Sequence, residues 1–228
     1  MAEQSAIVVS IDEIDINSGR IMEKTGQYVY SPGMLISVPT NYRAVLLPED
    51  GEPIHVKSCQ KKKLSRYFSS DMVGKRFSAL YVTMRPLTVM SWGIGSLPIR
   101  YSFLDNACMH VGAGGTLMPR IDDPIAFFNA FGKTEGAVNT TECASAITLS
   151  FRKMASEILV DMFNEAMQPI FETTFMVSEM ERRLNEKVCS VPHERAPGII
   201  FDSATVTSIR VNEEDKNAII ERFGKRKK

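Results

Sequence analysis

The sequence predicts an α+β protein, in which a β-rich part over residues 1–121 precedes a helical part with one late strand. Between residues 7 and 121, short apolar runs are separated by Gly, Pro, Asn and Asp, which is typical of extended segments joined by turns. From residue 122 onward, apolar residues recur mainly at steps of three and four, the period of an amphipathic helix. The sheet of the first part is expected to be antiparallel or mixed.

Four strands are clearest in the β-rich part. They are expected near residues 34–39, 43–48, 79–92 and 97–103. The last of them places four large side chains on one face, because alternate residues of a strand point the same way. These side chains are Leu97, Ile99, Tyr101 and Phe103. Turns are expected at residues 48–51 and at Asn106, since Gly and Asn tolerate positive φ.

A short helix and a long helix are expected to open the second part. Asp123 before Pro124 is a typical helix start, and Gly132 is a typical stop. The long helix is expected to start at Thr140 or Thr141, with Glu142 in its first turn. It should stop or kink at Gln168-Pro169, because proline removes a backbone donor and disfavours helical geometry in the residue before it.

The rest of the chain predicts one more strand between two helices. A helix over residues 174–189 has one apolar face and one strongly charged face, where Glu179 can pair with Arg183. Residues 199–211 have the pattern of a strand. Asn212 and the acidic residues after it indicate a last helix that ends near residue 224, followed by a basic tail over residues 225–228.

Composition limits the classes of function. Lys plus Arg and Asp plus Glu number 27 each, so no overall field attracts the chain to nucleic acid or an anionic bilayer. Two local basic runs are interpreted as solvated charge. They are Lys61-Lys62-Lys63, placed in a loop, and Lys225-Arg226-Lys227-Lys228. The 228 residues suffice for one compact domain, and the single-domain prediction covers residues 1–228.

The four cysteines and the apolar segments bear on location. Cys59, Cys108, Cys143 and Cys189 are widely spaced and form no C-x-x-C pair. This pattern predicts reduced thiols in a cytoplasmic protein. The first ten residues lack the features of a secretory signal, and we expect no membrane-spanning helix.

Candidate catalytic and metal-binding residues are weak throughout, so no catalytic, cofactor-binding or metal site is predicted. The glycine run after His110, residues 112–115, is expected to be a closely packed or bulged strand rather than a phosphate loop. His55, His110 and His193 lack the spacing of zinc ligands. Cys108 and His110 can share one strand face, but no group is evident that would orient the histidine.

Acidic clusters and large apolar residues also have ordinary explanations. Three acidic clusters are read as a solvated edge or turn and two helix starts: Asp12-Glu13-Asp15, Asp122-Asp123 and Glu213-Glu214-Asp215. Four sulfur-containing or aromatic residues are expected in the core: Met154, Met162, Met180 and Trp92.

Four stretches also carry a likeness to a known superfamily. Residues 33–38 read Gly-Met-Leu-Ile-Ser-Val, with Ala44-Val45 and a turn after them. Trp92-Gly93 stands between two expected strands, and Ile121-Asp122-Asp123-Pro124 is similar to an "I-x-D-P" strand end. Residues 198–211 form a closing strand before Asn212. In this order they resemble the SPFH or band 7 superfamily of stomatins, prohibitins and flotillins over about residues 5–215, its soluble bacterial members most closely.

The resemblance implies an SPFH-like fold, no enzymatic activity, no cofactor, and a scaffold that forms homo-oligomers with a peripheral link to the inner face of a membrane. Many members have an apolar N-terminal anchor and a long C-terminal helical region, and this sequence shows neither. At residues 55–75, a lysine-rich segment stands where the family has a Pro-Gly turn. Self-association is expected through unpaired strand edges and the charged face of residues 174–189, so deleting that helix should break assembly.

Two alternatives stay open at this point. A nucleic-acid-associated protein would use the two basic runs, and its binding would weaken steeply with added salt. An enzyme of unrecognised type would need a pocket with clustered titratable groups, for which the surroundings of Cys108 and His110 are the place to look.

Overall fold

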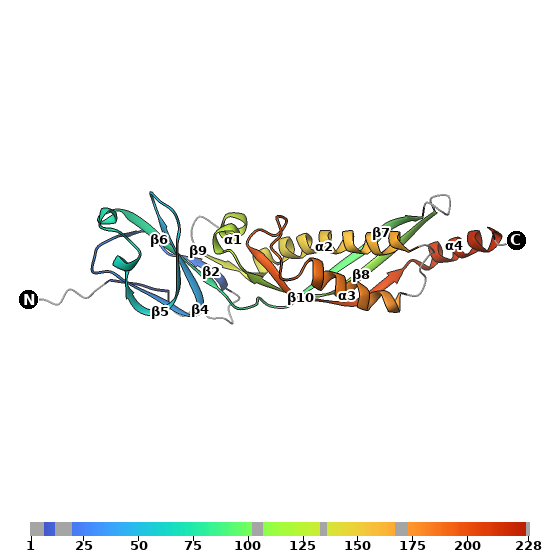
Figure 1. Ribbon diagram of the computed structural model, residues 1–228, viewed down its shortest axis with the longest axis horizontal. Helices are drawn as coiled ribbons and strands as arrows, with labels where there is room; N and C mark the ends of the chain where they lie inside the picture. Colours follow the sequence, from blue (N-terminus) through green and yellow to red (C-terminus); the bar gives the residue numbers. More distant parts are fainter. Residues whose placement is uncertain (1–6, 12–19, 102–106, 133–135, 167–172, 227–228) are drawn as a thin grey trace, which may run out of the picture. The chain divides into compact units, whose positions relative to one another are not determined.

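The computed structural model (Figure 1) describes residues 7–11, 20–101, 107–132, 136–166 and 173–226. Its strands are β1 (Val8–Val9), β2 (Arg20–Lys24), β3 (Tyr28–Val29), β4 (Leu35–Pro48), β5 (Ile54–Lys63), β6 (Arg76–Thr83), β7 (Met90–Tyr101), β8 (Ala107–Ile121), β9 (Gly136–Asn139) and β10 (Ile199–Val211). Its α-helices are α1 (Pro124–Phe131), α2 (Thr140–Glu165), α3 (Thr174–Lys187) and α4 (Glu213–Arg226), and two 3-10 turns are η2 (Leu64–Arg66) and η3 (Ser70–Met72). The predicted α+β class, with helices and a late strand after a β-rich part, is confirmed.

The chain folds into two compact units that share the sequence in alternating segments. The first unit comprises residues 1–87, 120–143 and 197–199. The second comprises residues 88–119, 144–196 and 200–228. Each unit is therefore built from segments far apart in the sequence. The single domain over residues 1–228 stays a prediction.

The first unit contains a seven-stranded sheet with the order β1-β4-β6-β2-β9, in which β5 also pairs with β4 and β3 with β6. β1 runs parallel to β4, whereas the other pairings are antiparallel, so the sheet is mixed. Strands, 3-10 turns and loops contribute to its core, in which Phe68 contacts both Tyr30 and Phe77 at ring-centroid distances of 5.0 Å.

Two predicted strand boundaries were wrong. The strands expected at residues 34–39 and 43–48 are one strand, β4, which continues through Asn41 by adopting a positive φ of 67°. The strand expected over residues 79–92 is instead divided between β6 and β7. The break lies at residues 84–89, where Pro86 has no N–H to donate. Trp92-Gly93 therefore lies inside β7 rather than between strands.

The turn between β4 and β5 was predicted correctly. Gly51 has a φ of +146°, a backbone conformation that residues with a Cβ rarely adopt. The placement of Lys61, Lys62 and Lys63 in a loop was wrong, because they form the exposed end of β5. This end of β5 shows no alternation of apolar and polar side chains, and the sequence therefore suggested a loop. The turn expected at Asn106 lies outside the described residues.

The start of α1 confirms the cap prediction. The Asp123 carboxylate accepts hydrogen bonds from the backbone N–H of Ile125 and Ala126, at 2.9 and 3.1 Å. Pro124 occupies the first turn and Gly132 follows the helix. The short strand β9, which pairs with β2, was not predicted.

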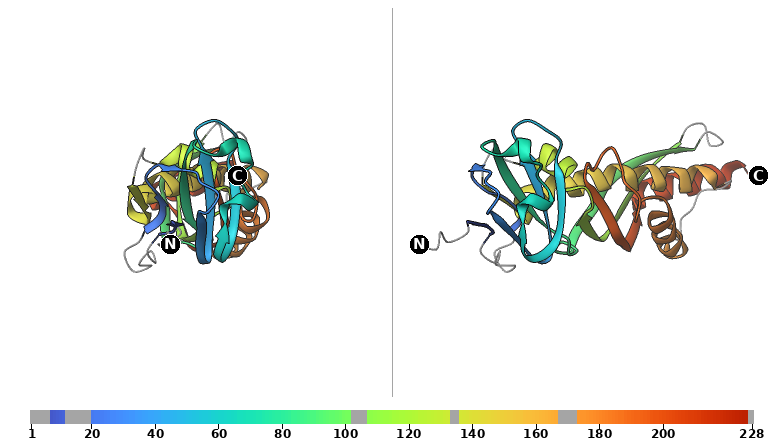
Figure 2. Two further views of the ribbon diagram at one scale, coloured as in Figure 1. Left: turned by 90° about the vertical axis from the view of Figure 1, so that its left-hand side faces the viewer. Right: turned by 60° about the vertical axis from the view of Figure 1, so that its left-hand side comes forward.

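The second unit contains a three-stranded sheet with the order β10-β8-β7. Ile99 is buried and Pro98 and Arg100 are exposed, so the expected alternation in β7 is confirmed where its side chains are described. α2 runs alongside this sheet (Figure 2), and Phe151 of α2 lies 5.4 Å from Trp92 of β7 between ring centroids. Trp92 is 4% exposed, as expected of a core residue.

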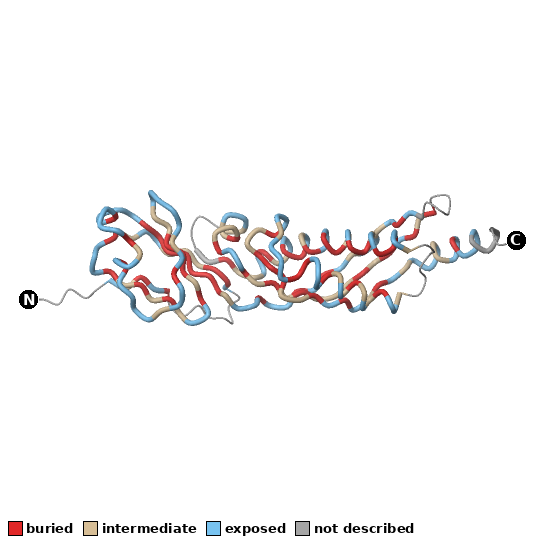
Figure 3. The backbone as a smooth tube through the Cα atoms, in the orientation of Figure 1, coloured by how far each residue is buried: buried red, intermediate tan, exposed pale blue. Residues whose placement is uncertain are grey.

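The helices of the second unit agree with the sequence patterns. Buried residues recur between exposed ones along α2 (Figure 3), and the three methionines expected in the core, Met154, Met162 and Met180, are buried. α2 begins at Thr140 and ends at Glu165, and the predicted stop at Gln168-Pro169 lies outside the described residues. α4 extends to Arg226, so the first two residues of the predicted basic tail are helical.

Candidate interaction surfaces

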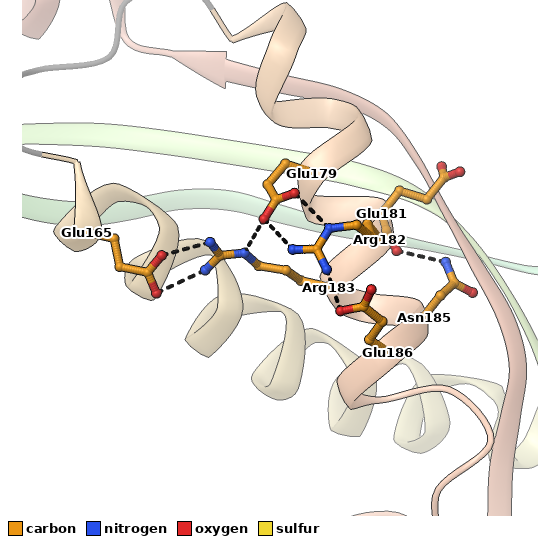
Figure 4. Close-up of polar contacts among 7 residues, drawn as sticks. All are labelled: Glu165, Glu179, Glu181, Arg182, Arg183, Asn185 and Glu186. Carbon is orange, nitrogen blue, oxygen red and sulfur yellow. Dashed lines mark hydrogen bonds and ion pairs between the residues drawn. The ribbon is translucent and has the colours of Figure 1, made fainter.

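The charged face of α3 is engaged within the chain (Figure 4). Glu179 accepts from Arg182 Nε and Nη2, at 2.9 and 2.7 Å, and from Arg183 Nε at 2.6 Å. The latter contact confirms the predicted Glu179–Arg183 pair. Arg183 also donates to both carboxylate oxygens of Glu165 on α2, at 3.0 and 2.7 Å. This bidentate contact fastens α3 to α2.

The network lowers the pKa of two carboxylates, Glu179 and Glu165. Hydrogen bonds from Arg182 and then Arg183 lower the pKa of Glu179 to about 2. The hydrogen bond from Arg183 likewise lowers the pKa of Glu165. A carboxylate whose pKa is depressed by folding stabilises the folded state above its unfolded pKa and loses this contribution as pH falls.

An Arg182→Gln/Arg183→Gln variant should therefore differ from the parent protein in a pH-dependent way. At neutral pH we expect the thermal midpoint to drop by roughly 2–4 °C, since these are largely exposed pairs. The difference should shrink as pH falls from the ordinary glutamate pKa of 4.5 toward about 2. Thermal melts across this range measure it. A constant difference would contradict the assignment of the stabilisation to these ion pairs.

A second set of α3 side chains covers the outer edge of β10. The Asn185 amide donates to the carbonyl of Ala204 at 2.8 Å and accepts from the N–H of the same residue at 3.3 Å. Glu181 accepts from the N–H of Val206 at 2.8 Å. Thr173, immediately before α3, donates to the carbonyl of Ile209 at 2.8 Å. Side chains thus take the place of a fourth strand at this edge.

The opposite edge of the same sheet has no such cover among the described residues. β7 has β8 as its one strand neighbour there. The β7–β8 register shifts between Ile94 and Leu97, and Pro98 follows this bulge. The stretch before the bulge, residues 90–94, is regularly paired and its Ser91 and Gly93 are exposed. The two edges of the three-stranded sheet therefore differ.

α3 is also part of the core of the second unit. Met176, Met180 and Leu184 are buried. Deleting residues 174–189 would remove these side chains together with the cover of β10, so loss of assembly after that deletion could result from unfolding. Single substitutions are a sharper test of self-association.

Comparison with known protein families decides the classification. The model of the SPFH domain–Band 7 family matches residues 68–227, which include both sheet edges of the second unit. The chain belongs to this family. A comparison with curated proteins gives no match. The match leaves out residues 33–48, which the sequence resemblance had included. In the part of this SPFH-family chain that the structure describes, no helix has the length and apolar character needed to cross a bilayer.

The structure adds a partner for His110 that the sequence did not indicate. Asp215, in the first turn of α4, accepts from the backbone N–H of His110 and contacts its Nδ1, both at 2.8 Å. These bonds, of which the backbone bond is the largest cause, lower the pKa of Asp215. Asp215 is thus more than a first-turn acid. No local pattern could reveal this contact, since 105 residues separate the two.

Cys108 and His110 differ in their surroundings. A groove of about 420 Å³ in the second unit is lined by His110, Ser208 and Arg210 among others, but not by Cys108. The glycine run lies within the strand β8, as predicted. A Cβ on Gly112 would lie 3.0 Å from the carbonyl oxygens of Ile94 and Gly95, which confirms the close backbone packing.

The remaining sequence candidates are dispersed. His193 contacts the carbonyl of Val188 at 3.1 Å, and His55 is exposed on β5. Cys143 and Cys189 are buried, and burial raises the pKa of each thiol to about 11. Within the described ranges, no three metal-binding side chains come together. Asp12, Glu13 and Asp15 lie outside them.

Proposed function

We propose that this SPFH-family chain is a non-enzymatic scaffold that forms homo-oligomers through the free edge of β7. The observation that carries the proposal is the difference between the two edges of the three-stranded sheet. Side chains from α3 and Thr173 bond to the edge of β10, whereas β7 has strand contacts on one side among the described residues. Free backbone N–H and C=O groups at a strand edge pair readily with a second strand.

A second copy of the chain is the partner that symmetry favours. Two identical edges can pair antiparallel about a two-fold axis, so one surface serves both subunits. We place this pairing at residues 90–94, because the bulge and Pro98 interrupt the ladder beyond them. The charged face of α3 takes a smaller part in this proposal than the sequence suggested, since its arginines are bonded to glutamates of the same chain.

The proposals on membrane contact and location are supported by the family, not by a membrane-binding site in the structure. We propose a peripheral contact at the cytoplasmic face of a membrane. A nucleic-acid partner for the two basic runs, residues 61–63 and 225–228, is the alternative, and the zero net charge of the chain argues against it. It would appear as binding that weakens steeply as salt is added.

A Ser91→Lys substitution tests the β7 interface. It would bring like charges together across the two-fold axis, so we expect the parent protein to form a defined oligomer and the variant to dissociate at least about tenfold more readily. Light scattering across protein concentration measures this. Ser145→Lys is the matched control, because Ser145 is exposed on α2. A strictly monomeric parent would contradict the scaffold, and an unaffected Ser91→Lys oligomer would contradict the β7 interface.

A further inference from the structure

A polar hollow lies in the first unit where the β4–β5 ladder opens. Val38 pairs with Cys59, and Arg43 with Lys57, so residues 39–42 of β4 face a single residue of β5, Ser58. The opening has a volume of about 620 Å³. Its polar lining includes Ser37, Thr40, Asn41, Ser58, Gln60 and Arg85, and none of the described lining residues is acidic.

Three cationic residues flank this opening along β4 and β5, next to its lining residues but not among them. Arg43 and Lys57 lie directly opposite each other on neighbouring strands, an arrangement that costs stability when both are charged. Neither forms an ion pair with a described residue. Lys61 follows the lining residue Gln60 on the other side of the opening. An anion placed here would offset the repulsion.

Arg85 is held in the wall of the hollow in a defined orientation. With the Asn41 amide turned so that its oxygen faces Arg85, that oxygen accepts from Arg85 Nε at 3.1 Å and Nη2 at 2.7 Å. A guanidinium has five N–H donors, and the remaining ones of Arg85 bond to no other described residue, so they can serve a ligand. An arginine fixed in this way suits the planar, multiple hydrogen bonds that a phosphate accepts.

The backbone around the opening is also unusual. Asn41 on β4 and Lys61 on β5 adopt positive φ values of 67° and 34°, and they account for two of the three described non-glycine residues that do so. Such conformations cost free energy and concentrate at functional sites. Protection against edge-to-edge aggregation explains the lysines at the end of β5. It does not explain Arg43 opposite Lys57, or Arg85 held by Asn41.

We propose that this hollow binds a phosphate-bearing ligand, with Arg85 donating directional hydrogen bonds and Arg43, Lys57 and Lys61 supplying positive charge. The ligand can be a soluble phosphate compound or the headgroup of a phosphate-bearing lipid, since both present the same acceptor oxygens. The proposal does not rest on self-association, because all of these residues belong to the first unit.

The test measures binding to the full chain with two probes. Calorimetry with inorganic pyrophosphate examines a soluble ligand. Co-sedimentation with phosphatidylcholine vesicles that contain phosphatidic acid examines a lipid source, with pure phosphatidylcholine vesicles as the blank. We expect Lys57→Gln/Arg85→Gln to weaken binding to the responding probe at least about tenfold, the effect of losing charge-assisted hydrogen bonds. Arg85→Lys keeps the charge but loses the fork, so its loss should be intermediate.

Arg152→Gln/Lys153→Gln is the matched control, because it removes the same two charges from exposed positions of α2. It should bind within about twofold of the parent, because neither side chain lines the hollow. Circular dichroism confirms that each variant is folded. Binding of either probe with selective loss in the hollow variant supports the proposal and identifies the source. No binding of either probe, or equal loss in both double variants, overturns it.

Discussion

Gly115→Ala is expected to destabilise the second unit by about 3 kcal/mol, a large effect for one added methyl group. A Cβ at Gly115 would lie 1.9 Å from the carbonyl oxygen of Thr205 on β10. Because that atom belongs to the backbone, the clash cannot be relieved by a side-chain rotation. β8 and β10 would have to separate, at the point where the Thr116 and Thr205 hydroxyls bond at 2.7 Å.

Trp92 makes this prediction easy to measure. It is the single tryptophan of the chain and contacts Phe151 in the second unit, so its fluorescence during urea unfolding reports on that unit. Gly93→Ala is the control. Its Cβ would meet no described atom closer than the Ala113 carbonyl oxygen at 3.8 Å, an ordinary contact. It should be neutral or slightly stabilising, since alanine restricts the unfolded chain more than glycine does. Equal losses in both variants would rule out the steric explanation.

Asn185→Ala is expected to cost about 2 kcal/mol and to make the protein associate through β10. The substitution leaves both the N–H and the carbonyl of Ala204 without their side-chain partner. An unpaired backbone group at a strand edge is costly when partly buried, and a strand from another molecule can satisfy it. Urea unfolding measures the first effect, and an increase in mass by light scattering measures the second.

Two further substitutions separate the contributions. Asn185→Asp keeps an acceptor for the Ala204 N–H and loses the donor to its carbonyl, so its effect should lie between those of the parent and Asn185→Ala. Glu186→Ala changes the next residue of α3, which accepts a hydrogen bond from Arg182 on the same helix, and it should not alter association. If the Glu186 variant associated as strongly as Asn185→Ala, the cover of β10 would not be the cause.

Local patterns in the sequence determined most of the elements. Asp123 with Pro124 marked the start of α1, and the strand at residues 199–211 agrees with β10 at both ends. These signals act between residues close in the chain, through caps, turns and side-chain periodicity. They failed at two places. β4 continues through Asn41, where the sequence suggested a break between two strands. The lysines at the end of β5 lack apolar alternation, so the sequence suggested a loop.

Only the tertiary structure decided which edges and charges are available to a partner. Asn185 looks like an exposed helical residue, and its role at β10 depends on a strand 19 residues away. Asp215 meets His110, and Arg85 meets Asn41, across longer separations that no periodicity records. Sequence patterns therefore predicted the helices, some of the strands and the cap at Asp123. Which strand edge is covered, and which cations lack a partner, depends on contacts between distant segments, which exist only once the chain has folded.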